Sequence, residues 1–475
     1  MEYLELKISP PVFKSFQTDD IDTDELMNKI LRQIKGIIKA YSSYISMRMS
    51  DTEPCDSFRY PRLGIVYHFI KHEDSDNFSG YNCSPNDRSN QLDCSDYNTM
   101  RKKNISFLKA LRQLMNKYPV LTDYIVGIDA ASIENETEPW VFSPVFRAAR
   151  QNSNTIPYSL EKNGKIQTLG FTYHVGEDFR HIISGLRHID EVLDHFDYKS
   201  GDRLGHAIAL GIDIDHYVSR SEMVSIPIME HLENLLWMWQ NTQNDNLAFA
   251  PENLDFKIME VARRIYGENI DGINVYTLWR AYQAKFDDLD KYDLSNKCCD
   301  IVKKHHLIIE KSKSWDFNDI LYTFHCPCFY ELYHRPIFVS ANENVSFYKE
   351  LQNKLIRKVE KMGIYVEANP SSNAVIGDIK SIMNHPILRL NSIQGENGTS
   401  VMTTINSDDP IIFSTNVENE IAYIYYSLLN ANFSREKALE WIDKIRSHGV
   451  NSTFIKSRKN FKMMNEDLKT ILDYD

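Results

Sequence analysis

The sequence predicts an α/β protein of the TIM-like (β/α) barrel class that carries a large helical insertion. Two observations support this prediction. Short apolar runs rich in Val, Ile and aromatic residues alternate with segments whose apolar residues recur at helical spacing, and this alternation is typical of parallel β/α units. Polar clusters follow several of these runs, and the carboxyl ends of barrel strands are where such a fold gathers its functional side chains.

Seven apolar runs are expected to form the barrel strands, with amphipathic helices between them. The expected strands are residues 3–8, 63–70, 124–129, 170–174, 203–206, 363–368 and 403–406. The expected helices are residues 24–47, 100–117, 143–151, 179–195 and 417–429. A further helix is expected over residues 434–447, with Ser434 as its N-cap.

Two stretches interrupt this alternation. Residues 71–98 are dense in Asp, Asn, Ser and Cys, which predicts a long loop over one end of the barrel and a candidate lid. Residues 215–361 are mostly helical in pattern, over 229–241, 256–266, 275–286 and 345–361, and they far exceed a barrel connection. We therefore expect five strands within residues 1–214, a helical subdomain over 215–361, and the last two strands with the terminal helices in 362–475.

The overall charge favours a small-molecule substrate. The chain has 475 residues and a formal net charge of -12, and nucleic-acid binding normally requires an excess of Lys and Arg to neutralise phosphates. A nucleic-acid partner is therefore not expected. The first eleven residues have no cationic leader, and no apolar run is long enough to span a bilayer. We expect a cytoplasmic protein without a membrane partner.

The cysteines do not indicate a disulfide framework or a structural zinc site. They are scattered and odd in number, unlike those of a small secreted domain; the seven are Cys55, Cys83, Cys94, Cys298, Cys299, Cys326 and Cys328. The last two form a single C-x-C after His325, without the second ligand pair that a structural zinc site needs. We expect free thiols in core or loop positions.

Four polar clusters lie where expected strands end. They are His-Val-Gly-Glu at 174–177, Arg-Leu-Gly-His at 203–206, Pro-Ser-Ser-Asn at 370–373 and Ser-Asp-Asp-Pro at 407–410. Imidazole and carboxylate groups together suit Zn²⁺, and a Glu with a second His can carry protons for an activated water. A single His beside a strand is more often structural, and Asp-Asp-Pro is usually a turn. Four such clusters in succession instead indicate a hydrolytic site.

In order, these clusters resemble the H-x-G-E, R-x-G-H, P-x-S-N and T/S-D-D-P motifs of the adenosine deaminase family. Residues 3–10 are a weaker match to the family's E-x-R-x-S-P strand, and residues 126–129 to its G-I-D strand. The resemblance spans the barrel from end to end, apart from the two interrupting stretches. It implies a (β/α)8 barrel of adenosine deaminase type that converts adenosine or an adenine nucleotide to the inosine form through a metal-activated water.

The resemblance also implies roles for four residues. His174 and Asp408 would be ligands of a Zn²⁺ cofactor. Glu177 would protonate the purine ring nitrogen, and His206 would orient and deprotonate the attacking water. The cysteine-ligated zinc signature of cytosine and tRNA deaminases, H-x-E with P-C-x-x-C, does not occur in the sequence.

Substrate contacts are implied at three further positions. Asp409 would hold the base through its other ring, and Gly176 and Ser132 would lie against the substrate. Ser132 stands where the family often has Gly, which lets the backbone approach a ligand closely. Lys7 stands where the family commonly has Arg. Both departures affect how the substrate would fit.

The family's first strand ends in H-x-H, and this chain has no such motif. His68 is expected to be structural with His72 just beyond its strand, and His305 and His306 fall in the helical insertion. Residues 3–8 resemble the family's second strand, so the barrel is expected to lack its first strand and to bring two metal ligands where a catalytic zinc normally has three. A lost segment, a further chain that carries the H-x-H strand, or a rearranged inactive site would each account for this.

Within the wider family, the helical insertion and the Ser-Asp-Asp-Pro ending most resemble the deaminase component of bacterial RADAR antiviral systems. That resemblance implies a homo-oligomer that acts in antiviral defence on adenosine or adenine nucleotides. Two alternatives remain open from the residues. One is an inactive scaffold or nucleoside-binding shell protein of the same fold, and the other is an AMP-deaminase-like hydrolase with the same set of site residues.

Overall fold

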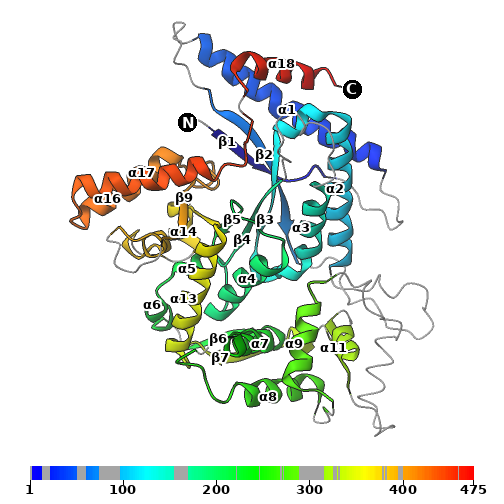
Figure 1. Cartoon of the computed structure of the whole chain (residues 1–475), viewed down its shortest axis with the longest axis vertical. Helices are drawn as coiled ribbons and strands as arrows, with labels where there is room; N and C mark the ends of the chain where they lie inside the picture. Colours follow the sequence, from blue (N-terminus) through cyan, green and yellow to red (C-terminus); the bar gives the residue numbers. More distant parts are fainter. Residues whose placement is uncertain are drawn as a thin grey trace.

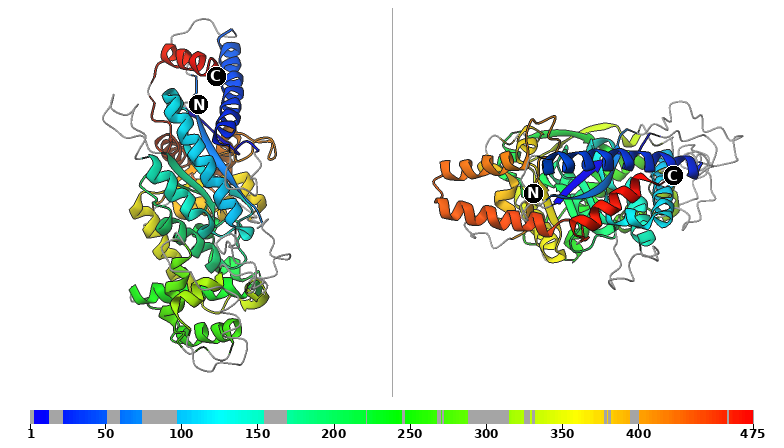
Figure 2. Two further views of the ribbon diagram at one scale, coloured as in Figure 1. Left: turned by 90° about the vertical axis from the view of Figure 1, so that its right-hand side faces the viewer. Right: turned by 90° about the horizontal axis from the view of Figure 1, so that it is seen from above.

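A computed structural model describes most of the chain, and Figures 1 and 2 show its path. The described residues are 3–12, 22–50, 60–73, 97–153, 169–220, 222–244, 247–267, 270, 272–287, 315–324, 329, 332–376, 379, 382–393, 400–457 and 459–474. Residues 74–96 of the predicted lid, all seven cysteines and the pair His305 and His306 lie outside the described residues.

Seven parallel strands form one curled sheet in the order β1-β2-β3-β4-β5-β8-β9. They are β1 (Tyr3–Ile8), β2 (Arg62–Lys71), β3 (Ile125–Ser132), β4 (Gly170–Val175), β5 (Arg203–His206), β8 (Tyr365–Ala368) and β9 (Met402–Ile405). The seven predicted strands are confirmed, with ends that differ by a few residues. The fold is a TIM-like α/β half-barrel.

The sheet has two free edges in the part of the chain that the structure describes. β1 pairs only with β2, and β9 pairs only with β8. The outer edge of each strand therefore presents backbone N–H and C=O groups without a strand partner. The open edges lie where the resemblance implies that a first strand is absent.

Helices cover the outer face of the sheet in chain order. They are α1 (Thr23–Ser50), α2 (Asn98–Lys117), α3 (Pro139–Ser153), α4 (Ile182–His195) and α13 (Val345–Met362). Each packs on the next around the sheet. On α1 the apolar residues recur every four positions, and Ile30, Ile34 and Ile38 are fully buried against the core.

The remaining helices flank the barrel ends. The short ones are α5 (Ile208–Gly211), α6 (Ile214–Val218), α14 (Pro370–Ile376) and α15 (Pro386–Leu390), and the terminal ones are α16 (Val417–Asn430), α17 (Arg435–Asn451) and α18 (Phe461–Leu472). α16 and α17 project together from the barrel beside β9 (Figure 2). The predicted cap is confirmed, because the Ser434 hydroxyl accepts from the Lys437 N–H at the start of α17. α18, which packs on α1, was not predicted.

The segment between β5 and β8 contains a small two-stranded sheet as well as helices. Its helices include α7 (Ile228–Asn244), α8 (Leu254–Tyr266), α9 (Val275–Ala284) and α11 (Phe317–Phe324). β6 (Met223–Pro227) and β7 (Pro336–Ser340) pair antiparallel as a separate two-stranded sheet. The expected boundaries of the helical subdomain, at residues 214 and 361, stay a prediction. α13 lies within those boundaries, yet it packs on α4, α5 and α6 as a barrel helix does.

Charged side chains fill the interior of the half-barrel beneath the strand ends. On β1, Leu4 and Leu6 pack against the core under the helices, whereas Glu5 and Lys7 take part in ion pairs. Arg203 bridges two carboxylates, with Nη1 2.7 Å from Glu5 Oε2 and Nε 2.8 Å from Glu367 Oε1.

The far end of this interior is closed by the chain after α17. Phe454 and Ile455 are buried there, and the Phe454 N–H donates to Glu5 Oε1 at 2.6 Å. The Arg203 guanidinium lies over the Phe454 ring, 3.7 Å from its centroid, a favourable cation–aromatic arrangement. The floor of the barrel is therefore linked to the interior ion pairs.

The buried charge of Glu367 gives a pH-dependent prediction. Burial alone would raise the pKa of this carboxyl, but Lys7 and Arg203 lower it from 4.5 to about 2. A depressed carboxyl pKa contributes stability that is present above the unfolded value and lost as pH falls through the folded value. Glu367→Gln is expected to lower the free energy of unfolding by roughly 3 kcal/mol at neutral pH, measured by urea denaturation.

The difference between parent and Glu367→Gln should shrink as pH falls from 4.5 toward 2, because the parent carboxyl then takes up its proton. Glu436→Gln, an exposed carboxyl in the first turn of α17, is the control, with an expected change below about 0.5 kcal/mol. A loss of stability that does not vary with pH would contradict a role for the Glu367 charge.

Candidate metal centre

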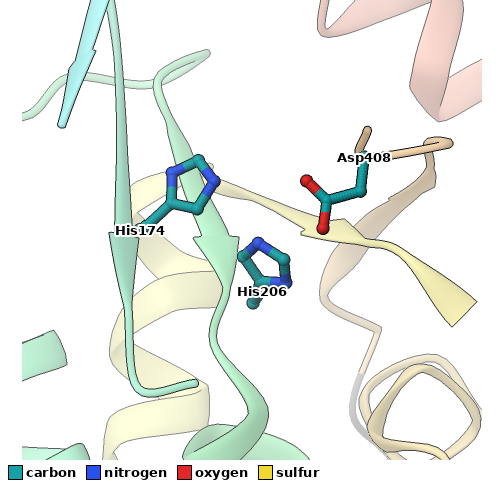
Figure 3. A group of neighbouring side chains, drawn as sticks. All are labelled: His174, His206 and Asp408. Atoms are coloured by element: carbon teal, nitrogen blue, oxygen red, sulfur yellow. The ribbon is translucent and has the colours of Figure 1, made fainter. Parts of the chain in front are cut away.

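Three side chains with metal-binding atoms converge at the carboxyl ends of the strands. His174 belongs to β4, His206 ends β5, and Asp408 lies in the loop after β9. One nitrogen or oxygen of each lies within 4.8 Å of those of the other two, and no other such group occurs among the residues searched, which are the described ones. Figure 3 shows the three side chains pointing toward one another.

His174 is oriented by a buried carboxylate. Its Nδ1 lies 3.1 Å from Oδ1 of Asp129, which is completely buried at the middle of β3. Burial raises the pKa of Asp129, but His174 and Lys7 lower it well below its ordinary value. The carboxylate is therefore ionised and suited to accept the Nδ1 proton, which leaves Nε2 of His174 for an ion.

His206 and Glu177 form a second pair. Nδ1 of His206 lies 2.8 Å from Glu177 Oε1, and the amide nitrogen of Asn373 lies 2.7 Å from the same ring nitrogen. Burial lowers the pKa of His206, but Glu177 raises it above its ordinary value. Burial likewise raises the pKa of Glu177, and His206 lowers it. Each member of the pair therefore favours the charged form of the other.

The two aspartates of the Asp-Asp-Pro turn have different surroundings. Asp408 Oδ2 accepts from the Ser372 hydroxyl at 2.6 Å, and its carboxylate faces the two histidines. Asp409 Oδ1 instead accepts the N–H groups of Ile411 and Ile412 at 3.0 and 3.2 Å. The structure therefore does not bring Asp409 into the cluster, and its implied contact with a base stays a prediction.

The backbone is left-handed at two members of the cluster. The φ angle is 60° at His206 and 53° at Asp408. This region costs a residue with a Cβ on the order of 1–2 kcal/mol, and such outliers concentrate at functional sites. Both side chains are therefore carried by left-handed backbone at or just after a strand end.

The glycines of the first two motifs make room for His174 and Glu177. A Cβ on Gly205 would lie 3.1 Å from both Cα and Nδ1 of His174, closer than side chains normally approach. Gly176 has a φ of 72°, and a Cβ there would lie 2.6 Å from Ile189. The Gly of R-x-G-H therefore leaves space for the imidazole on the neighbouring strand, and the Gly of H-x-G-E permits the turn.

The two implied backbone contacts with substrate stay predictions. Ser132 ends β3, is exposed, and has a φ of 90°, a conformation that favours glycine. Gly176 is buried, its N–H donates to Glu134 and its carbonyl accepts from Ala209. Only the Cα of Gly176 is therefore left to touch a ligand.

Several residues that surround the cluster were not predicted to take part in the site. His68, expected to be structural, lies on β2, where Nε2 is 2.9 Å from the Ser9 hydroxyl, and both Asp129 and His174 influence its pKa, which burial lowers. Lys71, at the end of the same strand, donates to the His174 carbonyl. The Gly-Ile-Asp run that contains Asp129 was recognised, but its link to His174 was not.

The donor atoms of the cluster suit Zn²⁺. Two imidazoles and a carboxylate oxygen are its common ligands, and a carboxylate partner for the ligating His is a usual feature of such sites. His174 has that partner in Asp129, and Asp408 has a hydroxyl donor in Ser372. His206 was predicted to act on water, and its position between Glu177 and Asp408 is compatible with that role or with ligation.

The chain is an α/β half-barrel with three potential metal ligands at its strand ends, and part of its sequence is similar to adenosine deaminases. No protein-family model matches the chain. A stretch of 109 residues, 23% of the chain, is 29% identical to 26% of the adenosine deaminase of Plasmodium gallinaceum. A stretch of 112 residues is 30% identical to 27% of the adenosine deaminase of Plasmodium vivax (strain Salvador I).

Each matched stretch thus spans about a quarter of the length of the curated relative. Among solved structures, the crystal structure of an adenine deaminase from Arthrobacter aurescens aligns over 96% of this chain and 80% of its own, with 12% identity and a TM-score of 0.35. Within the described ranges, no helix is both long and apolar enough to cross a membrane.

Proposed function

We propose that this chain is the larger part of a metal-dependent deaminase that uses water to convert adenosine or an adenine nucleotide to the inosine form, with release of ammonia. The observation that carries the proposal is the convergence of His174, His206 and Asp408 from three separate strand ends. The partial matches to adenosine deaminases support the substrate class. Action in the cytoplasm and in antiviral defence is proposed from sequence and resemblance alone.

A Zn²⁺ held by His174 and Asp408 would polarise a water and make it nucleophilic near neutral pH. Asp129 would keep Nε2 of His174 directed at the ion, and Ser372 would orient the Asp408 carboxylate. His206 would hold the water through its second ring nitrogen, because Nδ1 already faces Glu177. These side chains therefore orient the nucleophile.

Glu177 and His206 would move the protons. As the water oxygen bonds to the aminated ring carbon, one water proton would pass through His206 to the amino group, and the ring nitrogen would take a proton from Glu177. The carbon–nitrogen bond then breaks, ammonia leaves, and the second water proton returns to Glu177, so that the oxygen ends as the carbonyl oxygen. Because the pKa of Glu177 is lowered by His206, Glu177 must first receive its proton from that neighbour or from the water. Their separation of 2.8 Å permits direct transfer.

A further strand is proposed to complete the site. β1 and β9 offer free edges, and the exposed fractions of Ile411 and Ile412, in the loop that follows β9, are 90% and 73%. Apolar side chains that are this exposed beside an open sheet edge are typical of a covered surface. We propose that the chain forms a homo-oligomer, and that a further chain or segment supplies the strand and the remaining metal ligands.

An inactive scaffold or nucleoside-binding shell protein is the second candidate. It is favoured by the turn at Asp409, whose carboxylate is engaged by its own backbone and not directed at the cluster. In this case the metal centre would be incomplete and the insertion would serve assembly. An AMP-deaminase-like activity differs from the leading proposal only in its substrate.

The test is ammonia release by the assembly purified with this chain from its own cells, with and without added Zn²⁺, on adenosine, AMP, ATP and adenine. We expect stoichiometric zinc and conversion of one or more of these substrates to its deaminated product. Zinc binding without ammonia from any substrate would overturn the catalytic proposal. Absence of bound zinc would favour the scaffold.

A further inference from the structure

The turn that carries His174 and Glu177 is held by two buried side chains, one from β2 and one from the segment that follows β3. Lys71, the last residue of β2, donates through Nζ to the His174 carbonyl. Glu134, just after β3, accepts two backbone N–H groups: Oε2 that of Gly176 at 2.8 Å, and Oε1 that of Glu177 at 3.0 Å. We refer to Lys71 and Glu134 as the turn clamp.

The other backbone groups of this turn are bonded to the start of α5. The Ala207 N–H donates to the Val175 carbonyl at 3.1 Å, and the Ala209 N–H donates to the Gly176 carbonyl at 2.8 Å. Of these five backbone hydrogen bonds, three come from the turn clamp. A buried turn must find such partners, because an unsatisfied backbone group is costly.

The clamp residues are chosen by their chemistry as well as by their position. Lys71 is 2% exposed and Glu134 is 4% exposed, so each charge needs its opposite nearby. Two adjacent N–H groups require two acceptor oxygens, which a carboxylate offers and an amide does not. The Lys71 ammonium also lies 4.2 Å from the centroid of the Tyr173 ring, which fixes its direction.

We propose that Lys71 and Glu134 are positioning residues that set the geometry between His174 and Glu177. His174 lies on one side of Gly176 and Glu177 on the other, so a shift of this turn changes the distance between the ion-binding nitrogen and the proton-carrying carboxylate. The assignment of these two functions rests on the proposed function. The hold on the turn itself rests only on the contacts of the clamp.

The test compares Glu134→Gln with Glu230→Gln. The Glu134→Gln side chain places an NH₂ group against one of the two backbone N–H groups, so one hydrogen bond is lost. Glu230 is equally buried at 5% exposed, but it bonds Ser184 and Arg180 and not the turn. We expect hydrogen–deuterium exchange at the Gly176 and Glu177 amides to be at least about tenfold faster in Glu134→Gln only.

Zinc affinity, measured by titration with Zn²⁺ alone, is the second readout. Glu134→Gln and Lys71→Met should each weaken it by about 10–100-fold, and the double variant by less than the product, because both act on one turn. If hydrogen–deuterium exchange at the Gly176 and Glu177 amides were unchanged in Glu134→Gln, the turn clamp would be overturned. If exchange became faster but zinc affinity stayed the same, the positioning role of the clamp would be overturned. A parent chain that binds no zinc would overturn the proposed function, and exchange would still decide the clamp.

Discussion

Replacing Glu177 by Gln is expected to lower ammonia release by a factor of about 100 to 10,000, with zinc still bound. The change removes the group that would carry a proton to the ring nitrogen, and it leaves His174 and Asp408 untouched. The amide of the Glu177→Gln variant retains an oxygen near Nδ1 of His206, so the local packing is preserved. The measurement is the rate of ammonia release under the conditions in which the parent is active, together with zinc content.

Asp178→Asn is the matched control for this prediction. Asp178 adjoins Glu177, is half-buried as Glu177 is, and lies outside the three-residue cluster. Its neutralisation should change turnover by less than about threefold, which is the effect of a nearby charge screened by solvent. If Glu177→Gln turned over substrate as fast as Asp178→Asn, Glu177 could not be the proton carrier.

The strands could be predicted because parallel strands covered on both faces are continuous apolar runs. Residues 63–70 are an example, with only one His among apolar residues and Gly. The two-stranded sheet of β6 and β7 lacked this signal. Its strands are short and are separated by more than a hundred residues, so no local pattern links them. Each also has a Pro at one end, Pro227 and Pro336, and proline in a short run argues against a strand.

The three members of the cluster could be predicted as site residues, His174 and Asp408 as ligands and His206 as the group that acts on water, because each lies at or just after the end of a strand and belongs to a distinctive motif. The order of the motifs along the chain is therefore enough to place them at one end of the sheet. Asp409 shows the limit of this reasoning. Two neighbouring aspartates are equivalent in sequence, and only the local turn separates the one that faces the histidines from the one that bonds its own backbone.

The supporting residues could not be predicted, because their partners are backbone atoms or distant in sequence. Lys71 and Glu134 contact main-chain groups, which every residue has, so nothing at positions 174–177 indicates them. Phe454 lies in a polar-flanked stretch that is typical of a loop, yet it fills the floor of the barrel. The positions of these side chains depend on tertiary packing, and no short stretch of the sequence indicates them.

Removing the imidazole of His174 is expected to abolish stoichiometric zinc binding. The cluster offers three ligand atoms within 4.8 Å, and loss of one leaves too few for the usual zinc coordination. Because an ion that binds only the folded chain stabilises it by an amount that grows with the logarithm of its affinity, added Zn²⁺ should raise the melting temperature of the parent and not that of His174→Ala. Asp408→Asn should behave in the same way.

His68→Asn tests whether the effect belongs to the cluster or to any interior histidine. His68 lies on the neighbouring strand and bonds Ser9, so its replacement should leave the zinc-dependent shift in melting temperature intact. Loss of the shift in His68→Asn would show that the ion is held nearer to β2, and retention of zinc by both His174→Ala and Asp408→Asn would place the ion elsewhere. The proposed deaminase requires that the zinc-dependent shift is lost in His174→Ala and Asp408→Asn and kept in His68→Asn, because its water must be activated where the ends of β4, β5 and β9 meet.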